Sequence, residues 1–384
     1  MEEPKGELET AMDKEILFEA RNHIGFVTLN RPAALNALSY SMVREMHAQL
    51  REWARDASIY AVVVKGAGNK AFCAGGDVRA VHASFTSSGS MHHEFFALEY
   101  RLDYFIHRYS KPYVALMDGI VMGGGMGIGQ GAFLRLVTDR TRMAMPEVGI
   151  GFFPDVGASC FLSRLPGGLG RYLALSGNAI GGVDALYAGL ADVYVAHEAL
   201  GPLEAALATL RWSRDHSADI RGAVDAFLMP ARPEPALASL RPSIDEHFSG
   251  SDIRVILNSL RYESRPTHAE WAKQTLAAME RRSPLMMEVT ARELERGRTM
   301  NLPDCFRMEL GMVRHCFEQG DFMEGVRAVL VDKDNAPHWN PARIEDVNEE
   351  MSAAFFVDPW AGASHPLANL ETEGRNGVRR ETGE

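Results

Sequence analysis

A run of glycines between residues 123 and 131 constrains the fold of this chain more than any other feature of its sequence. Six of these nine positions are glycine: Gly123, Gly124, Gly125, Gly127, Gly129 and Gly131. Inside a regular helix or strand, glycine costs roughly 0.5–1 kcal/mol relative to alanine. So dense a run therefore indicates a backbone that another group approaches closely, with N–H groups directed toward that group.

A second, shorter glycine turn lies upstream at residues 74–77, where Gly75 and Gly76 are adjacent. This turn and the turn at Gly123–Gly125, at the start of the run, each follow a predicted strand and precede a predicted helix. The first turn of a helix has N–H groups without partners and the positive end of the helix dipole. Two such N–H groups directed at one point form an oxyanion hole, which would polarise a thioester carbonyl. Each turn alone is better explained by tight packing of a helix on a strand, but the pair, together with nearby acids, favours a binding function.

Two carboxylates, Glu147 and Asp155, follow the glycine run in a loop interrupted by Pro146 and Pro154. Glu147 has a simple explanation as a surface acid, and Asp155 as the N-cap of a helix that begins near residue 156. The neighbours of Glu147 argue against a surface position, because they are apolar: Met143, Met145, Val148, Ile150, Phe152 and Phe153. Desolvation in such surroundings raises a carboxyl pKa, which suits general acid or base catalysis.

Glu99 is a third candidate acid, in a helix predicted over residues 92–109. It is in phase with Phe95 and Leu102, so it lies on or near the apolar face of that helix. An acid at the edge of the apolar face and an acid in a ligand pocket are equally compatible with this position.

The pattern of predicted elements changes near residue 200. Before it, strands, loops and helices alternate, which predicts a largely parallel sheet backed by helices, with a hairpin over residues 16–29. Beyond it only helical periodicity remains, and Ser283-Pro284 is typical of a helix start. We therefore predict a core at 14–200, a helical region at 201–362 and a disordered tail at 363–384, preceded by a loose leader at 1–13.

Charge and composition argue against several partners. The net charge is -11 with no long basic run, which argues against nucleic acid and an anionic membrane surface. No apolar run is long enough to span a membrane, and the first residues resemble neither a signal peptide nor a transit peptide, so we expect a cytoplasmic protein. The four cysteines, Cys73, Cys160, Cys305 and Cys316, lack metal-ligand spacing. They are expected to be reduced thiols, and no metal site is predicted.

Several familiar catalytic motifs are missing from the sequence. The glycine run does not fit GxGxxG, because Ile128 and Gln130 fall where its last glycine should be. No glycine precedes a lysine as in a P-loop, and neither GxSxG nor HExxH occurs. Dinucleotide-binding, ATP-binding and serine-hydrolase functions therefore have little support.

Several motifs together resemble the crotonase (enoyl-CoA hydratase/isomerase) superfamily. They are Asn30-Arg31-Pro32 with Asn36-Ala37-Leu38, Phe72-Cys73-Ala74-Gly75-Gly76-Asp77, Lys111-Pro112-Tyr113-Val114-Ala115 and Gly123-Gly124-Gly125. Two more restrictive motifs resemble the 3-hydroxyisobutyryl-CoA hydrolases within that superfamily. The first is Met145-Pro146-Glu147 with Gly151-Phe152-Phe153-Pro154-Asp155-Val156-Gly157. The second is Glu324-Gly325-Val326-Arg327-Ala328-Val329-Leu330-Val331-Asp332-Lys333-Asp334, followed by Pro337-His338-Trp339. The resemblance covers residues 14–357.

The resemblance implies an α/β fold, a crotonase-like spiral of ββα units followed by a helical C-terminal region. It implies an acyl-CoA thioester as the substrate and no separate cofactor, because CoA is part of the substrate. The thioester oxygen would be bound by the N–H groups of Gly76 and Gly124. Glu147 would be the nucleophile or base with Asp155 as its partner, and Glu99 would contact the substrate.

The resemblance also implies a reaction, the hydrolysis of 3-hydroxyisobutyryl-CoA as in valine catabolism, with 3-hydroxypropionyl-CoA as a related substrate. The adenine end of CoA would follow the backbone of the turn formed by Ala74, Gly75, Gly76 and Asp77. Members of the superfamily commonly trimerise through C-terminal helices, so a homo-oligomer is one option. The longer C-terminal half of this chain could instead fold over its own active site.

Two other functions stay open. Enoyl-CoA hydratases resemble this chain but carry a first catalytic glutamate three residues after the oxyanion glycine, and that position is Gly127 here. Hydration would then lack its usual pair of carboxylates. A catalytically silent acyl-CoA-binding protein of the same fold is the other alternative, and the presence of both Glu147 and Asp155 argues against it.

Overall fold

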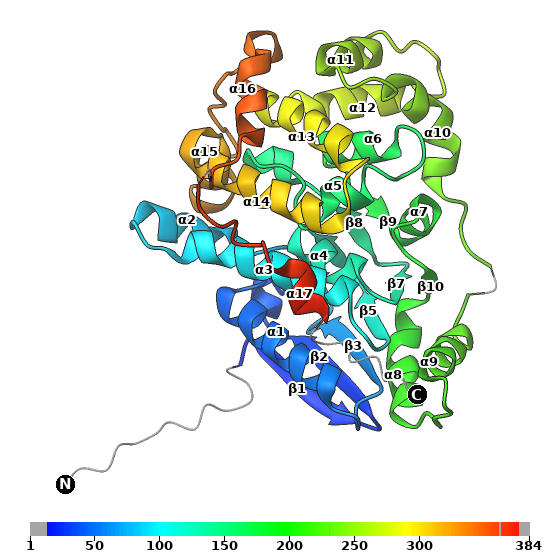
Figure 1. Cartoon of the computed structure of the whole chain (residues 1–384). Helices are drawn as coiled ribbons and strands as arrows, with labels where there is room; N and C mark the ends of the chain where they lie inside the picture. Colours follow the sequence, from blue (N-terminus) through cyan, green and yellow to red (C-terminus); the bar gives the residue numbers. More distant parts are fainter. Residues whose placement is uncertain (1–13, 230, 361, 376–384) are drawn as a thin grey trace.

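The computed structural model describes residues 14–229, 231–360 and 362–375 (Figure 1). The leader expected at residues 1–13 and the last part of the expected tail, residues 376–384, lie outside the described residues.

Two sheets form the centre of the described chain. The larger has six strands in the order β1-β2-β3-β5-β7-β10, and the smaller has four in the order β4-β6-β8-β9. The strands of the larger sheet are β1 (Ile16–Arg21), β2 (Ile24–Leu29), β3 (Ala61–Gly66), β5 (Tyr113–Met117), β7 (Leu134–Thr138) and β10 (Val193–Val195). Those of the smaller sheet are β4 (Ala71–Cys73), β6 (Ile120–Met122), β8 (Arg142–Ala144) and β9 (Ile180–Gly181).

The chain winds repeatedly between these sheets. After the antiparallel hairpin of β1 and β2, the parallel strands β3, β5 and β7 of the larger sheet are each followed by a strand of the smaller sheet and then by helices. This order is the expected spiral of ββα units. The predicted hairpin is also confirmed, and its turn places Asn22 and His23 at φ 47° and 64°, a conformation that asparagine and histidine adopt more readily than most residues.

The helices before residue 200 lie around the two sheets. They are α1 (Tyr40–Arg55), α2 (Val78–Thr86), α3 (Met91–His107), α4 (Gly124–Gln130), α5 (Ala158–Phe161), α6 (Leu169–Ser176) and α7 (Gly182–Ala188). In α1, Ser39 Oγ accepts the Met42 N–H and caps the helix. The helix buries an apolar stripe against the core: Met42, Val43, Met46, Leu50 and Trp53. Each such side chain contributes roughly 1.5–3 kcal/mol on burial.

Beyond β10 the described residues contain helices and no strand, as predicted. They are α8 (Leu200–Ala208), α9 (His216–Asp225), α10 (Ala236–His247), α11 (Ile253–Arg261), α12 (Ala269–Met279), α13 (Pro284–Gly297), α14 (Leu302–Gln319), α15 (Phe322–Val326), α16 (Glu349–Ala353) and α17 (Leu370–Arg375). Shorter helical turns are η1 (Pro32–Ala34), η2 (Glu147–Ile150), η3 (His197–Ala199), η4 (Arg327–Val331), η5 (Ile344–Asp346) and η6 (Ala354–Phe356). The predicted start of α13 is confirmed, because Ser283 Oγ accepts the Met286 N–H and Pro284 opens the helix.

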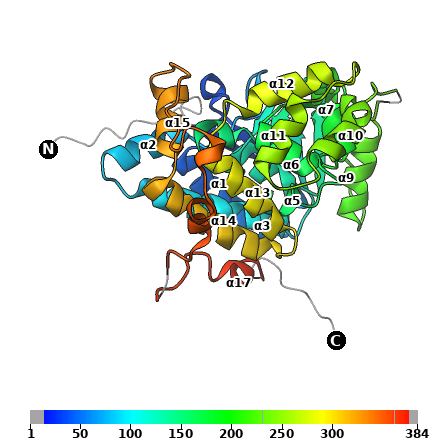
Figure 2. The ribbon, with the colours of Figure 1, turned by 90° about the horizontal axis from the view of Figure 1, so that it is seen from above.

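The two faces of the larger sheet are covered by different helices. Helices α8 and α9 pack on one face, where Leu203, Leu207, Ile220 and Val224 join a cluster with apolar strand residues. The main core lies on the other side and includes buried residues of helices from most of the chain, among them α1, α3, α6, α13, α14 and α17. Figures 1 and 2 show α14 lying beside α3, and the two helices are in contact, whereas α13 packs on α5, α6 and η2. The C-terminal helices therefore cover the part of the spiral that carries the candidate site.

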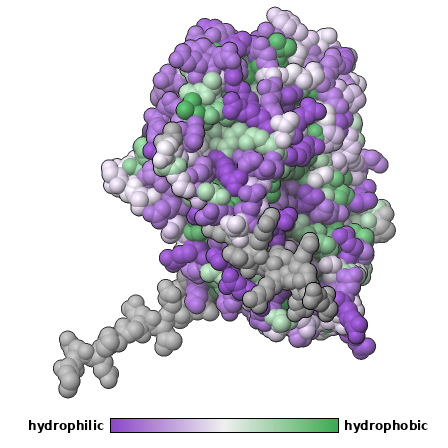
Figure 3. Space-filling model, viewed as in Figure 1, coloured by the Kyte–Doolittle hydropathy of each residue, from purple (hydrophilic) through white to green (hydrophobic). Residues whose placement is uncertain are grey.

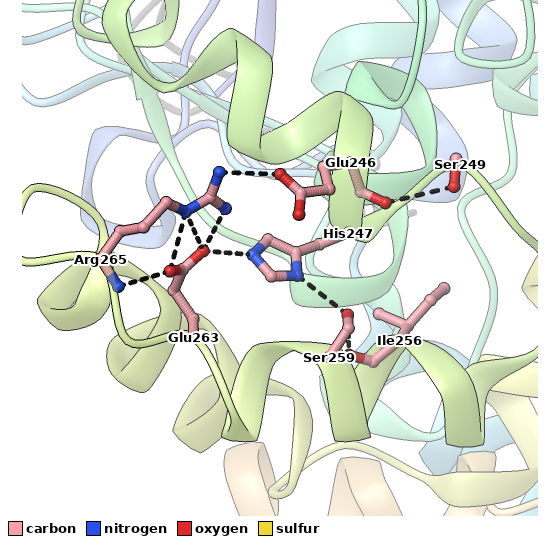
Figure 4. Close-up of polar contacts among 7 residues, drawn as sticks. All are labelled: Glu246, His247, Ser249, Ile256, Ser259, Glu263 and Arg265. Carbon is pink, nitrogen blue, oxygen red and sulfur yellow. Dashed lines mark hydrogen bonds and ion pairs between the residues drawn. The ribbon is translucent and has the colours of Figure 1, made fainter.

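A buried polar network holds α10 to α11 and to the loop that follows α11 (Figure 4). His247 Nδ1 is 2.9 Å from Ser259 Oγ, and His247 Nε2 is 3.0 Å from Glu263 Oε2. Glu263 also accepts from Arg265, which in turn donates to Glu246. The side chains of His247 and Glu263 are only 4% and 3% exposed, so each provides the hydrogen-bond partner that the other needs inside the protein.

The disordered tail predicted from residue 363 is wrong for its described part. Leu367 and Leu370 are buried, and α17 packs against α3. Arg101 donates to Pro366 O, and Arg307 donates to Leu367 O. The apolar contacts of these two leucines fix the segment. The prediction of disorder depended on average composition, which two leucines in a charged, glycine-containing segment barely change.

The surface of the described residues is mostly hydrophilic on the face shown in Figure 3, with hydrophobic residues in small groups. Among the helices of the described residues, none has both the length and the apolar character that crossing a membrane requires.

Candidate active site

A cavity of about 390 Å³ lies where the two glycine turns meet α3 and the segment after β8. Seven of the eight predicted site residues line it: Ala74, Gly75, Gly76, Glu99, Gly124, Glu147 and Asp155. These residues come from four separate stretches of sequence, which the spiral brings together.

The two backbone amides expected to bind an oxyanion are neighbours. Gly76 follows β4, Gly124 opens α4, and a Cβ built on Gly124 would lie 3.3 Å from Gly76 N. Gly75 and Gly123 have φ 114° and 49°, which glycine adopts without strain. Among the described residues, neither the Gly76 nor the Gly124 N–H donates to a backbone carbonyl. Two adjacent free amides at a cavity wall can bind a carbonyl oxygen that gains negative charge.

Most of the glycine run serves helix packing. The helix predicted to follow the turn already begins at Gly124, and residues 124–130 form α4, in which every residue is buried. Side chains at Gly125 and Gly129 would overlap Cys73 and the sulfur of Met117. Most of these glycines therefore let the helix pack closely among α3, β4 and β5, and the first ones face the cavity.

Glu147 is a buried carboxyl at the start of η2. A Cβ on Gly123 would lie 2.9 Å from Glu147 Oε1, so the acid sits directly beside the second glycine turn. Burial, and then the charge of Asp155, raise the pKa of Glu147 well above its ordinary value, while Arg282 opposes the rise. Its Oε2 has no hydrogen-bond partner within the described chain. The expected desolvation of this acid is confirmed.

Asp155 is also buried, and its carboxylate accepts a hydrogen bond of 2.7 Å from the Tyr100 hydroxyl. Burial raises the pKa of Asp155 to about 7, against the effect of the Tyr100 bond. The alternative that Asp155 caps a helix does not hold, because α5 begins after Gly157 and has no side-chain cap. Tyr100 was not among the predicted site residues, although it follows Glu99 directly.

Glu99 points from α3 into the cavity, which decides between the two interpretations of its position. It is 2% exposed, and a side chain at Gly124 would overlap its Oε1. Burial and then Asp155 raise the pKa of Glu99 well above its ordinary value. Gly124 therefore has to be glycine, because a side chain there would occupy the position of the Glu99 carboxyl.

Asp77 is the predicted residue that does not line the cavity. Its carboxylate accepts from the Ala80 N–H at the start of α2 and from Arg31 Nη2 at 2.9 Å. Its part in binding CoA stays a prediction.

A model of the enoyl-CoA hydratase/isomerase family matches residues 24–356 of this chain. The chain belongs to the enoyl-CoA hydratase/isomerase family. The predicted crotonase resemblance and the predicted fold are thereby confirmed.

Individual relatives within this family carry different activities in their names. A 3-hydroxyisobutyryl-CoA hydrolase, mitochondrial, of Gallus gallus is 40% identical over 92% of this chain and 90% of its own length. The protein of the same name from Homo sapiens is 37% identical over 88% of this chain and 87% of its own length. Among solved structures, a carnitinyl-CoA dehydratase from Mycobacterium thermoresistibile has a TM-score of 0.83 and 40% identity, covering 90% of this chain and 98% of its own. An enoyl-CoA hydratase from Rhodobacter sphaeroides 2.4.1 has a TM-score of 0.81 and 35% identity, with the same coverage.

Arg282 also lines the cavity, although no feature of the sequence predicted it. It precedes the cap of α13, and its guanidinium donates to Ser176 O through Nε at 3.0 Å and Nη2 at 2.7 Å. A Cβ on Gly149 would overlap its Nη1. Its charge favours the ionised form of Glu147. No local pattern in the sequence marks it, because only the tertiary fold brings α13 beside η2.

The C-terminal region completes the cavity wall with Phe322, Val329, Leu330 and Asn335. Arg327 fixes this segment, because its guanidinium pairs with Glu324, Asp332 and Asp334 at 2.7 Å each. The motif at residues 324–334 was identified by resemblance alone, without a role for any residue. In the structure, this motif holds the C-terminal side of the cavity in place.

The position that holds an acid in hydratases is closed to a side chain here. A Cβ on Gly127 would lie 2.7 Å from Asp103 Oδ2 and 2.8 Å from Val156 Cβ. Asp103 is fully buried on α3, one turn after Glu99, and does not line the cavity. Within the part of the chain that the structure describes, no group of His, Cys, Asp and Glu side chains is arranged to hold a metal ion.

Proposed function

We propose that this chain hydrolyses the thioester of short 3-hydroxyacyl-CoA substrates, with 3-hydroxyisobutyryl-CoA as the first to test. The observation that carries the proposal is a buried carboxyl, Glu147, beside two free backbone amides, with no second acid possible at Gly127. Curated relatives named 3-hydroxyisobutyryl-CoA hydrolase, about 40% identical over most of the chain, support the same reaction.

The first step polarises the thioester. Its carbonyl oxygen accepts hydrogen bonds from the N–H groups of Gly76 and Gly124, which stabilise the oxyanion as the carbonyl carbon becomes tetrahedral. Because these donors are fixed by the backbone, they need no rearrangement during the reaction. Collapse of the tetrahedral intermediate breaks the carbon–sulfur bond and releases the CoA thiolate, a good leaving group that needs little acid assistance.

Glu147 supplies the attacking oxygen in one of two ways. It attacks the carbonyl carbon to give a mixed anhydride that water then hydrolyses, or it takes a proton from a water whose oxygen attacks. Both versions need the ionised carboxylate, and the raised pKa of Glu147 makes that carboxylate a stronger base than an exposed glutamate. Arg282 favours the ionised form at working pH.

Asp155 and Glu99 bind and orient the acyl group. The 3-hydroxyl of the substrate donates to Asp155, whose other contact, the Tyr100 hydroxyl, holds the carboxylate in place. The charge of Asp155 also raises the pKa of Glu147, so it adjusts the protonation of the reacting acid. One methyl group is worth only ~1–3 kcal/mol of discrimination, so 3-hydroxypropionyl-CoA is expected to be accepted as well.

The proposal needs no cofactor, because CoA belongs to the substrate, and no nucleic-acid or membrane partner. Assembly into a homo-oligomer and a cytoplasmic location stay predictions. The relatives above are named as mitochondrial proteins, so the compartment is a question for fractionation of the native cell.

Hydration is the second candidate function. It is favoured by the two similar solved structures, which are named as a carnitinyl-CoA dehydratase and an enoyl-CoA hydratase. Addition of water across a double bond usually uses two carboxylates in this family. In this chain the first of the two positions is Gly127, where Asp103 and Val156 leave no room. A silent acyl-CoA-binding protein is the third candidate.

One assay separates the three. CoA thiol release from 3-hydroxyisobutyryl-CoA is measured beside loss of the crotonyl-CoA double bond, with the same preparation. We expect thiol release that saturates with substrate and little hydration. Efficient hydration without thiol release would favour a hydratase, and neither activity with retained CoA-ester binding would favour a binding protein.

The two versions of the Glu147 step are separated by a single turnover in ¹⁸O-water. Water that attacks the Glu147 carbonyl of a mixed anhydride leaves ¹⁸O in the Glu147 carboxylate, whereas direct attack of water on the thioester labels only the released hydroxy acid. Label in the peptide that contains Glu147 would therefore establish the anhydride route, and neither label there nor trapping of the anhydride by hydroxylamine is expected if Glu147 activates water.

A further inference from the structure

Two cysteines that are far apart in the sequence lie together where α5 packs on α14. Cys160 lies on α5, Cys305 lies on the first turn of α14, and the Cys305 thiol donates a hydrogen bond to the Cys160 sulfur. Both are free thiols in the structure. Neither lines the candidate active site.

The two thiols have different environments. Cys305 is fully buried, and its thiol is also 3.9 Å from Gly297 O. Cys160 is half-buried, and Arg164 Nη1 donates to its sulfur. Arg164 is fixed in this position because its Nη2 donates to Met300 O at 2.6 Å. A cation held against a partly exposed sulfur favours the thiolate, which is the reactive form of cysteine.

The titration of Cys160 agrees with this geometry. The Cys305 bond lowers the pKa of the Cys160 thiol to about 7, helped by Arg164, while burial and the charge of Glu309 oppose the shift. The same bond, and then burial, raise the pKa of Cys305 far above its ordinary value. One partly exposed thiolate therefore faces one buried thiol, the arrangement of a reactive cysteine beside a resolving cysteine.

The protein holds both helices in this relation independently of the sulfurs. Glu309, one turn after Cys305 on α14, accepts from the Gly157 N–H at 2.8 Å and from the Ser159 N–H at 3.1 Å. Arg164 also lines a polar cavity of about 800 Å³ with Arg171 and Arg298, so the side of Cys160 that faces Arg164 is close to solvent.

We propose that Cys160 and Cys305 are an oxidation site that forms a disulfide when hydrogen peroxide reaches the protein. The Cys160 thiolate attacks a peroxide oxygen, so the O–O bond breaks, hydroxide leaves, and Cys160 becomes a sulfenic acid. The Cys305 sulfur then attacks the Cys160 sulfur. The S–O bond breaks, water leaves with the Cys305 proton, and the S–S bond forms. Per disulfide, one hydrogen peroxide is reduced to two waters, one of them formed from the hydroxide and the proton that Cys160 lost, and two thiols are oxidised.

The disulfide would tie α5 to α14, which Glu309 already joins. The link therefore forms without displacing Asp155, and it closes a long loop of the chain, which restricts the unfolded state. Oxidised protein is expected to keep its reduced-state activity and to unfold at a higher temperature than the reduced protein. This inference does not depend on the proposed hydrolysis.

The test uses the full-length chain, fully reduced and freed of reductant, with one equivalent of hydrogen peroxide. We expect the titratable thiols to fall from the four free cysteines to two, the intact mass to fall by two hydrogens, and peptide mapping to find Cys160 joined to Cys305. Cys160→Ser should slow peroxide-dependent thiol loss by roughly tenfold. Cys305→Ser should leave a Cys160 sulfenic acid that dimedone traps.

Cys316→Ser is the matched control, because Cys316 is a buried cysteine on the same helix α14, and it should still form the disulfide. Four thiols remaining after peroxide treatment, a disulfide between other cysteines or between two chains, or equal thiol loss in Cys160→Ser would each overturn the proposal. The mapping on the unmodified chain decides the matter even if a serine variant fails to fold.

Discussion

The hydroxyl of Tyr100 donates a 2.7 Å hydrogen bond to Asp155 Oδ2, and both side chains are buried. Burial raises the pKa of Asp155 to about 7, and the Tyr100 bond works in the opposite direction. Tyr100 thus keeps Asp155 ionisable near neutral pH, in the form that accepts a hydrogen bond from a substrate hydroxyl.

Replacing Tyr100 by phenylalanine removes that bond and should raise the pKa of Asp155 further. We expect the acid limb of the kcat/KM profile for thioester hydrolysis to move to higher pH by about one unit, since a hydrogen bond to a charged group is worth about 1.5–3 kcal/mol. Tyr109→Phe is the control, because the Tyr109 hydroxyl donates to Leu50 O outside the cavity. An unmoved acid limb in Tyr100→Phe would show that Asp155 titration does not govern the rate.

Introducing the missing hydratase acid should not create a hydratase. In Gly127→Glu, the new side chain meets Asp103 Oδ2 and Val156 Cβ at less than van der Waals distance. Overpacking of this kind costs about 1–3 kcal/mol, and the added charge faces a buried acid. We expect a lower Tm by thermal denaturation and no gain in crotonyl-CoA hydration. A stable Gly127→Glu protein that hydrates crotonyl-CoA would contradict this explanation of Gly127.

Asp103 makes stability depend on pH. It is fully buried, and neither carboxyl oxygen has a partner among the described residues. Burial, then the charges of Glu99, Asp155 and Glu309, raise its pKa well above the ordinary value of 3.8. The folded protein therefore binds this proton more tightly than the unfolded chain, so the free energy of unfolding falls as the pH rises from about 4 through the folded pKa.

Asp103→Asn removes this titration while keeping the shape of the side chain. We expect the variant to be more stable than the unmodified chain at pH 8, by about 1–3 kcal/mol, with a smaller difference at pH 4.5. Urea unfolding across this pH range measures the effect, with the exposed Asp225→Asn as control. A variant that is less stable at every pH would mean that Asp103 has a partner which stabilises its ionised form.

The network around His247 gives a stability prediction far from the chemistry (Figure 4). His247→Ala leaves the buried Glu263 without one of its donors and removes a buried ring, so we expect a loss of about 1–3 kcal/mol. Glu246→Ala removes only an ion pair to Arg265 whose side chains are 43% and 60% exposed, and should cost less than about 1 kcal/mol. Equal losses in the two variants would show that the network is not what holds α10 to α11.

The local parts of the fold were predictable because their signals are local. Ser39 as a cap, the apolar stripe of α1 and the hairpin at residues 16–29 each depend on residues a few positions apart. The positions of Glu147 and Asp155 in the cavity followed from motif resemblance together with apolar surroundings. Their shared burial with Glu99, which raises all three pKa values, needed the structure.

The remaining features depend on contacts between distant parts of the chain. Arg282 reaches the cavity only because α13 packs beside η2, and the Cys160–Cys305 pair exists only because α5 packs on α14. The buried leucines near α17 were missed because two apolar residues barely change the composition of a charged segment. A helix was predicted to follow the second glycine turn, but its start at Gly124, inside the turn, was not. Glycines discourage a helix in isolation, whereas close packing on all sides selects one here.

The central claim is that Glu147 reacts with the thioester or activates the water that does. Glu147→Gln keeps the size and hydrogen-bonding capacity of the side chain and removes its charge, and Glu318→Gln, on the exposed side of α14, is the control. The measurement is CoA release from 3-hydroxyisobutyryl-CoA together with the Kd of a non-hydrolysable CoA thioether. We predict that Glu147→Gln slows release by about 10³-fold or more while the Kd changes only a few-fold, and near-native release would contradict the account.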